Sequence, residues 1–225
     1  QSNSPYAFVV KANVDDDQDE VAALASRYDL LAVPVGAGSR WLAAHGVDAV
    51  IAQGAEAGGH RGIFDPLAPD GQMSTFTLVQ TIRRHTDIPL IAAGGVMDGA
   101  GINSVMNLGA DGAQLGTAFL LCPESSTDGG YREALKSASD GQTVLTSAIS
   151  GRPARCLVNG WREINDPSLI PAYPVAYDAG KALASAAKAQ GDRQYGAHWA
   201  GQGVSLIREL PAAELIRTLV RESGF

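Results

Sequence analysis

The chain has 225 residues, of which 45% are hydrophobic and 18% are charged, and its formal net charge is −7. This composition is typical of a globular protein that buries a substantial core, in one large domain or two small ones, and it excludes a disordered chain. Because the charge balance is acidic, we expect neither nucleic acid nor an anionic membrane surface as a partner.

The cysteine content and the lengths of the apolar runs bear on the cellular location. Cys122 and Cys156 make neither a disulfide framework nor a metal-ligand spacing, so we expect reduced thiols and no metal site. No apolar run approaches the length of a membrane span, and residues 1–5 lack the basic and apolar segments of a signal peptide. We therefore expect a cytoplasmic protein.

Short apolar runs alternate with helical patterns over the first 122 residues. The runs predict strands at residues 6–10, 30–35, 49–53, 90–93 and 111–114. The patterns between them predict helices at residues 15–28, 40–45, 75–85 and 100–108. Strands that alternate with helices of about ten residues are typical of βαβ units, so we expect a parallel sheet.

The pattern changes after Pro123. Three helices are predicted, at residues 131–139, 176–190 and 211–222, and a stretch rich in glycine and proline covers residues 151–174. We therefore divide the chain into a β/α part, residues 1–122, and a helical part, residues 123–225.

A glycine-rich segment at residues 52–62 follows the third predicted strand. Four of its eleven positions are glycine, and it contains one histidine, His60. Glycine weakens a helix or a strand, so the segment needs tight backbone geometry or close approach to a bound molecule. Loops at the C-terminal ends of parallel strands are where α/β enzymes place their catalytic residues.

Three glycine-bearing segments, at residues 53–62, 93–96 and 114–117, each follow a predicted strand and precede a helix. Because the strands are parallel, we expect all three at one rim of a β/α barrel. The last two come from consecutive strands and are typical of a phosphate site, in which backbone N–H groups and a helix N-terminus bind the anion. Thr117 would add a hydroxyl donor. These segments predict a cofactor that carries phosphate.

His60 is the candidate for proton transfer, because an imidazole titrates near neutral pH and the neighbouring glycines leave room for a ligand. The alternative is a histidine that only hydrogen-bonds a turn. Tyr173, Tyr177 and Lys181 recur at intervals of four and form one stripe if they are helical. On spacing alone, this stripe predicts an ordinary helix face that is half-buried against the barrel.

The motifs resemble those of the nitronate monooxygenase family, formerly called 2-nitropropane dioxygenases. The resemblance rests on AQGAEAGGH at residues 52–60, IPLIAAGGV at 88–96 and GAQLGT at 112–117. SGRPAR at residues 150–155, the stripe of Tyr173, Tyr177 and Lys181, and WAGQG at 199–203 are also similar. The resemblance extends from about Trp41 to the C-terminus.

The resemblance implies an α/β fold, a parallel (β/α) barrel of TIM type, that binds FMN. It also implies oxidation of alkyl nitronates or nitroalkanes by molecular oxygen to a carbonyl compound and nitrite. His60 would be the catalytic base, and Tyr173, Tyr177 and Lys181 of the helical part would cover the substrate pocket. The positions that match the family's FMN-binding residues are Gln53, Gly58, Gly59, Gly94, Gly95, Gln114, Leu115, Gly116 and Thr117.

The barrel is expected to be incomplete, because only about five of its eight strands are predicted. An open parallel sheet exposes unpaired backbone groups at its edge, so we expect a second copy of the chain, a rearranged sheet or another segment to close it. Two other functions stay open. One is an FMN-dependent NAD(P)H reductase of quinones or enoyl thioesters on the same fold, and the other is a truncated, inactive family member.

Overall fold

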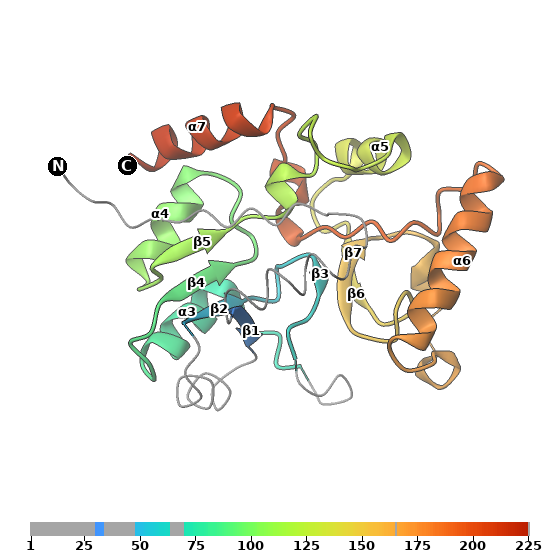
Figure 1. Cartoon of the computed structure of the whole chain (residues 1–225), viewed down its shortest axis with the longest axis horizontal. Coiled ribbons are helices and arrows are strands. Elements are labelled where there is room, and N and C mark those ends of the chain that lie inside the picture. Colours follow the sequence, from blue (N-terminus) through green and yellow to red (C-terminus); the bar gives the residue numbers. More distant parts are fainter. Residues whose placement is uncertain (1–29, 34–47, 64–69, 165, 225) are drawn as a thin grey trace.

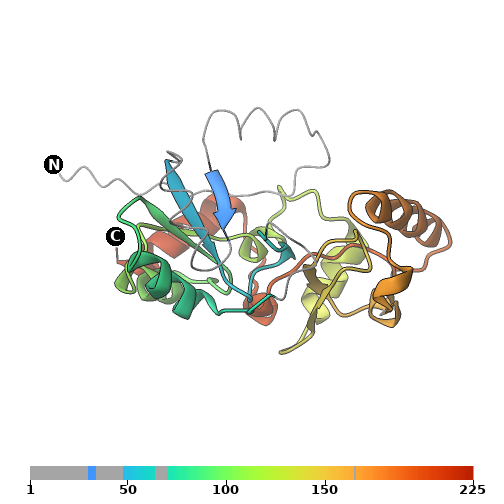
Figure 2. The same cartoon turned by 90° about the horizontal axis from the view of Figure 1, so that it is seen from below.

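Two β-sheets organise the molecule. The computed structural model describes residues 30–33, 48–63, 70–164 and 166–224. Figure 1 shows a parallel sheet with helices α3 (Thr75–Arg83), α4 (Gly99–Asn107) and α7 (Ala212–Ser223) at one end. An antiparallel sheet and helix α6 (Val175–Ala189) lie at the other end. Figure 2, a view from below, shows the same separation.

The parallel sheet has the strand order β1-β2-β4-β5. Its strands are β1 (Leu30–Val33), β2 (Ala49–Gln53), β4 (Leu90–Ala93) and β5 (Gly112–Gln114). The prediction of a parallel β/α sheet is therefore confirmed. The strand predicted at residues 6–10 and the helices predicted at 15–28 and 40–45 lie outside the described residues, so what is shown is a parallel sheet and not a closed barrel.

Helices α3 and α4 each begin at a side-chain cap; α4 follows the loop that ends β4, and the start of α3 contacts that loop, where the hydroxyl of Thr75 donates to the carbonyl of Gly94 at 2.9 Å. The hydroxyl of Ser74 accepts the N–H of Thr77 at 3.2 Å, and the carboxylate of Asp98 accepts the N–H of Gly101 at 2.7 Å. Such caps satisfy backbone donors that the first helical turn leaves unpaired. Both helix N-termini, which carry the positive end of the helix dipole, therefore lie near the C-terminal edge of the sheet.

Alternate residues of the central strands form the core of the parallel end. Val50, Ala52, Leu90 and Ala92 are fully buried and pack with Leu78, Val79 and Ile82 of α3. Because successive side chains of a strand point to opposite faces, Gln53 and Gln114 project from the face that does not pack on these helices. The core thus fixes which side chains face the candidate site.

Helix α7 returns from the end of the chain to the parallel sheet. Its Leu215 and Leu219 are buried in the same core, and the carboxylate of Glu222 accepts the N–H of Gly99 at 3.1 Å. A helix of the predicted helical part is therefore packed on α4 of the β/α part.

The second sheet is antiparallel, and its presence shows that two predictions from the sequence were wrong. It consists of β3 (Gly59–His60), β7 (Ala154–Leu157) and β6 (Thr143–Thr146), in that order. The region expected to be helical, residues 123–225, thus contains two strands, and His60 lies in a short strand instead of a loop. Strands of two to four residues are too short to show a period, and their pairing partners are distant in sequence.

The remaining helices follow the prediction closely. Helix α5 (Gly129–Ser137) and helices α6 and α7 begin within two residues of the predicted starts. Short 3₁₀ helices cover Thr117–Phe119, Gly160–Glu163, Pro167–Leu169 and Gln202–Leu206. Among the described helices, none combines the length and the apolarity that a bilayer crossing requires.

Candidate active site

The three glycine-bearing strand ends lie at one edge of the parallel sheet, as expected. Gln53 of β2 is in register with Ala93 of β4, which is in register with Gln114 of β5. All three strands run in the same direction, so the segments that follow them leave the sheet side by side. Two of these segments also contact each other: a Cβ on Gly94 would lie 2.9 Å from the backbone nitrogen of Ala57.

Several of these glycines have backbones that a larger residue does not tolerate. Gly94 and Gly95 have φ angles of +113° and +73°, in the region that favours glycine. A Cβ on Gly58 would lie 2.6 Å from the backbone carbon of Ala200. Gly116 differs, because within the described residues nothing beyond its chain neighbours lies within 4 Å of its Cβ position. The rim is closely packed at Gly58 and Gly94 and open at Gly116.

The C-terminal loop at residues 199–203 closes over this edge. The N–H of Gln202 donates to the carbonyl of Glu56 at 2.9 Å, and the N–H of Gly201 donates to Oγ1 of Thr117 at 2.9 Å. Glycine is required at 201 because a Cβ there would lie 2.6 Å from the oxygen of Glu56. The loop therefore joins the ends of β2 and β5.

Two glutamines at the strand ends have different surroundings. The amide of Gln53 is already engaged: its Nε2 donates to the carbonyl of His60 at 2.9 Å, and its Oε1 accepts the N–H of Gly62 at 2.7 Å. The Oε1 of Gln114, by contrast, is buried and has no hydrogen-bond partner in the described part of the chain. A buried amide oxygen without a partner is costly, which points to a donor supplied by a bound molecule.

His60 lies at the centre of a cluster of aromatic rings from distant parts of the sequence. Its ring centroid is 5.9 Å from that of Tyr173, 5.8 Å from that of Tyr177 and 5.2 Å from that of Trp199. Its Nε2 is 2.8 Å from Oγ of Ser150. The structure thus brings together the predicted base and two residues of the predicted substrate pocket.

Lys181, the third residue of the predicted stripe, lies beside Tyr177 in this cluster. Nζ of Lys181 lies 4.5 Å from the ring centroid of Tyr177, a cation–π contact. Tyr173 precedes helix α6, and Tyr177 and Lys181 lie on it one turn apart. The half-buried part of this stripe thus packs on the predicted base through both tyrosines.

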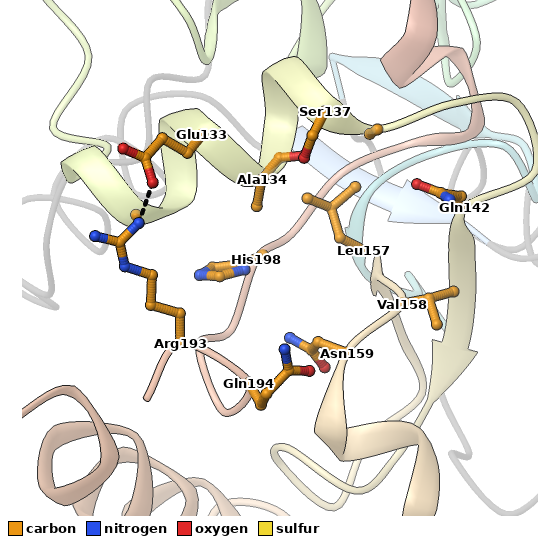
Figure 3. A pocket seen from close by; sticks show the side chains of 12 residues that line it. Glu133, Ala134, Ser137, Gln142, Leu157, Val158, Asn159, Arg193, Gln194 and His198 are labelled. Atoms are coloured by element: carbon orange, nitrogen blue, oxygen red, sulfur yellow. Dashed lines mark hydrogen bonds and ion pairs between the residues drawn. The ribbon is translucent and has the colours of Figure 1, made fainter. Parts of the chain in front are cut away.

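Two neighbouring cavities lie beside the cluster of aromatic rings around His60. One, of about 580 Å³, is lined by Tyr177, Lys181 and Trp199 together with residues of α5 and α6. The other, of about 370 Å³, lies between α5, the end of β7 and residues 193–198. Figure 3 shows Arg193 paired with Glu133 at one side of this cavity and His198 near its centre.

His198 stacks on Tyr131 with ring centroids 4.7 Å apart. Burial lowers the pKa of His198 below its usual 6.5, although the charge of Asp128 opposes this. The hydroxyl of Tyr131 donates to the carbonyl of Trp199, the residue that packs on His60. The wall of the second cavity is therefore connected, through Tyr131 and Trp199, to the aromatic rings around His60.

Buried arginines fix the segment that carries His60. Arg61 pairs with Asp70 at 2.7 Å and donates to the carbonyl of Gly54 at 2.7 Å. Arg155 of β7 donates from Nε to the carbonyl of Ala55 at 2.8 Å. Burial lowers the pKa of Arg155. These contacts explain how a segment with four glycines keeps one conformation.

Three residues of the site received no role from the sequence. Ser150 and Trp199 stand in motifs that carry the family resemblance, but neither residue type indicates proximity to His60. Glu56 has no partner nearby in sequence, whereas the structure pairs its carboxylate with the N–H and hydroxyl of Thr75, at 2.9 and 3.0 Å. Spatial contact across 19 to 90 positions is not visible in sequence spacing.

A family model described as nitronate monooxygenase matches residues 3–222 of the chain. The match reaches further toward the N-terminus than Trp41, from which the motifs alone predict the resemblance. A nitronate monooxygenase of Paraburkholderia phytofirmans is 57% identical over 182 residues, which are 80% of this chain and 50% of that protein. The nitronate monooxygenase of Pseudomonas aeruginosa is 52% identical over 182 residues, 80% and 52% of the two chains. The chain spans about half the length of these relatives.

Solved structures are similar as well. A nitroalkane oxidase from Streptomyces ansochromogenes matches with a TM-score of 0.83 and 40% identity, over 96% of this chain and 62% of that one. FabK from Thermotoga maritima matches with a TM-score of 0.71 and 30% identity, over 98% and 68%. The family model covers nearly the whole sequence, and the relatives agree with it in sequence and in fold: the chain belongs to the nitronate monooxygenase family.

Proposed function

We propose that this chain forms the phosphate-binding rim and the proton-transfer side of an FMN-dependent site that oxidises alkyl nitronates with molecular oxygen to a carbonyl compound and nitrite. The observation that carries the proposal is the position of His60, which lies among Tyr173, Tyr177 and Trp199 beside the glycine-bearing strand ends. We also infer that the parallel sheet is part of a TIM-type barrel, as the similarity to the nitroalkane oxidase structure supports.

The residues at the rim fit FMN. Gly95 and Gly116 are exposed at the ends of consecutive strands, and space is open at Gly116, where a phosphate can approach the backbone. The oxygen of Gln114, which has no partner among the described residues, is a ready acceptor for an N–H of the isoalloxazine ring. When bound, FMN supplies the electron transfer between the nitronate and oxygen.

The side chains around His60 form the part of the proposed site that binds the substrate. The imidazole takes the α-proton of a neutral nitroalkane, or polarises a nitronate that is already deprotonated. Tyr173 and Tyr177 pack against the ring and shield part of it from water. Lys181 places a positive charge behind Tyr177, where it favours an anionic nitronate over the neutral compound.

The test is anaerobic reduction of the FMN-loaded chain. An alkyl nitronate is expected to bleach the flavin absorbance, and readmitted oxygen should restore it with release of nitrite. Bleaching by NADH, with no response to the nitronate, would instead assign a reductase of quinones or enoyl thioesters. A chain that takes up no FMN and stays colourless would contradict both enzyme functions and indicate an inactive family member.

A further inference from the structure

We propose that Arg208 is a positioning residue for cofactor binding. It holds the loop after β4, residues 94–98, in the conformation that presents Gly95 to the phosphate of FMN. The inference rests on the proposed function, because it takes the strand ends as the phosphate-binding rim. Arg208 lies in the C-terminal segment, outside the motifs that carry the family resemblance.

The loop after β4 begins with two glycines that both have positive φ angles, +113° at Gly94 and +73° at Gly95. Gly95 is exposed at the rim. Glycine loses more conformational freedom on folding than any other residue. The first half of the loop is held by Thr75, whose hydroxyl donates to the carbonyl of Gly94 at 2.9 Å. The second half needs a contact of its own if the loop is to keep one conformation before a ligand binds.

Arg208 supplies this contact together with Glu222 of α7. Nη2 of Arg208 donates to the carbonyl of Met97 at 3.0 Å, and Nη1 donates to Oε1 of Glu222 at 2.6 Å. Oε2 of the same carboxylate accepts the N–H of Gly99 at 3.1 Å. The bonds from Arg208 and from the N–H of Gly99 lower the pKa of Glu222, which keeps the carboxylate charged at neutral pH. The two side chains thus fix the backbone on both sides of Asp98.

The C-terminal segment also packs closely against this half of the loop. A Cβ on Gly99 would lie 2.4 Å from the backbone carbon of Glu222. A Cβ on Gly203 would lie 2.6 Å from Cγ of Met97, a side chain that is itself buried. The end of the loop is therefore seated on the C-terminal segment, while Gly95 remains at the exposed rim.

The role of Arg208 is geometric, because its positive charge is balanced by Glu222 and the pair has no net charge to attract a phosphate dianion. What the pair provides is direction. The planar guanidinium presents its N–H groups as a rigid fork, so it can bond the carbonyl of Met97 and the carboxylate of Glu222 at once. A lysine at this position would carry the same charge on a flexible stem, without the fork.

The experiment combines ¹⁵N NMR relaxation of the FMN-free protein with titration of FMN. In the wild type we expect the order parameter of the Gly95 N–H to be near that of a rigid backbone, about 0.85, and in Arg208→Lys to fall clearly below it. The Kd of FMN should rise about threefold to tenfold in this variant, because binding must then order the loop. Glu209→Gln is the matched control: it breaks the ion pairs of the next residue with Arg132 and Lys136 of α5, at 3.1 and 2.6 Å, and should change neither quantity.

Glu222→Ala separates positioning from direct attraction of the phosphate. It removes a negative charge, so direct attraction by Arg208 predicts tighter binding of FMN, whereas positioning predicts weaker binding.

Tighter binding in Glu222→Ala, or a wild-type Kd in Arg208→Lys, overturns the proposal. So does a Gly95 N–H that is already mobile in the wild type, even if neither variant folds. If the wild type binds no FMN, the proposed function fails. The order parameter of Gly95 still decides the role of Arg208 in that case: a decrease in Arg208→Lys supports it, and an unchanged value overturns it.

Discussion

Thr117 accepts the backbone N–H of Gly201 through its side-chain oxygen at 2.9 Å, which ties the end of β5 to the C-terminal loop. The same loop contacts the segment before His60, because Gln202 donates to the carbonyl of Glu56. The hydroxyl hydrogen of Thr117 is not used in accepting the N–H of Gly201, so the side chain can hold the loop and still donate to a phosphate. In the proposed site, this one side chain would link the position of the loop to the binding of FMN.

Thr117→Val tests this link. The variant leaves the N–H of Gly201 without its partner, so we expect a loss of about 1–3 kcal/mol in the free energy of unfolding together with weaker FMN binding. Urea denaturation and quenching of FMN fluorescence measure the two effects. Thr127→Val is the matched control, because it removes a bond of 2.8 Å to the carbonyl of Leu120, away from the strand ends. It should lower stability alone; a similar loss of FMN affinity in both variants would disprove the phosphate contact.

Gly116→Ala separates ligand binding from folding. In the part of the chain that the structure describes, the added methyl group meets no atom within 4 Å beyond its chain neighbours, so we expect Tm to stay as in the wild type. It would occupy the space through which a phosphate reaches the backbone, and we expect FMN affinity to fall about tenfold or more. Gly129→Ala, at another exposed glycine that has no described residue near its Cβ position, should change neither quantity. Unaltered affinity in Gly116→Ala would place the phosphate elsewhere.

His60→Asn tests the base. FMN should remain bound, since the side chain is on the substrate side, while turnover of neutral nitroalkanes should fall by about 10²–10⁴-fold. Preformed nitronates have already lost the α-proton, so their turnover should fall much less. Steady-state rates with the two forms of one compound give the comparison. Equal losses with both forms would show that His60 does not act in proton abstraction.

Stability should depend on pH through His198. Burial lowers the pKa of His198 in the folded state, whereas the unfolded chain binds the proton near pH 6.5. Above about pH 6.5 the ring is neutral in both states; as the pH falls below this value, the unfolded state gains the proton first and the free energy of unfolding decreases, until the folded pKa is reached.

His198→Phe keeps a flat ring against Tyr131 and removes the titration. Its free energy of unfolding should change less than that of the wild type between about pH 7.5 and about pH 5.5, as urea denaturation at both values would show. His85→Gln, at an exposed position, should retain the wild-type dependence. A pH dependence that is the same in all three proteins would contradict the assignment to His198.

Local sequence patterns were sufficient to predict the parts of the structure that depend on residues close together in the sequence. The parallel sheet follows from buried runs such as Val50 to Ala52 between helical patterns, and the rim follows because parallel strands end at one edge. The stripe of Tyr173, Tyr177 and Lys181 was visible as a spacing. Its contact with His60 was not, because on spacing alone the same stripe fits any half-buried helix face.

The antiparallel sheet escaped prediction for a physical reason. Gly59–His60 is too short to carry a period, and it becomes a strand only because Arg155 and Ala154 pair with it. The same pairing turns the imidazole toward the hydroxyl of Ser150 and the ring of Trp199. None of these neighbours can be inferred from spacing, since each is brought close by the packing of other elements.

The sequence by itself determined the residue types of the rim, the parallel β/α order up to β5 and the family, because glycines and apolar periods report directly on backbone geometry and burial. Only the tertiary structure decided which groups meet. It pairs the amide of Gln53 but leaves Oε1 of Gln114 without a partner among the described residues. It also places Ser150 beside His60 and packs helix α7 into the core of the parallel sheet. Hydrogen bonds and ring contacts depend on distance in space, and chain folding sets that distance independently of separation along the sequence.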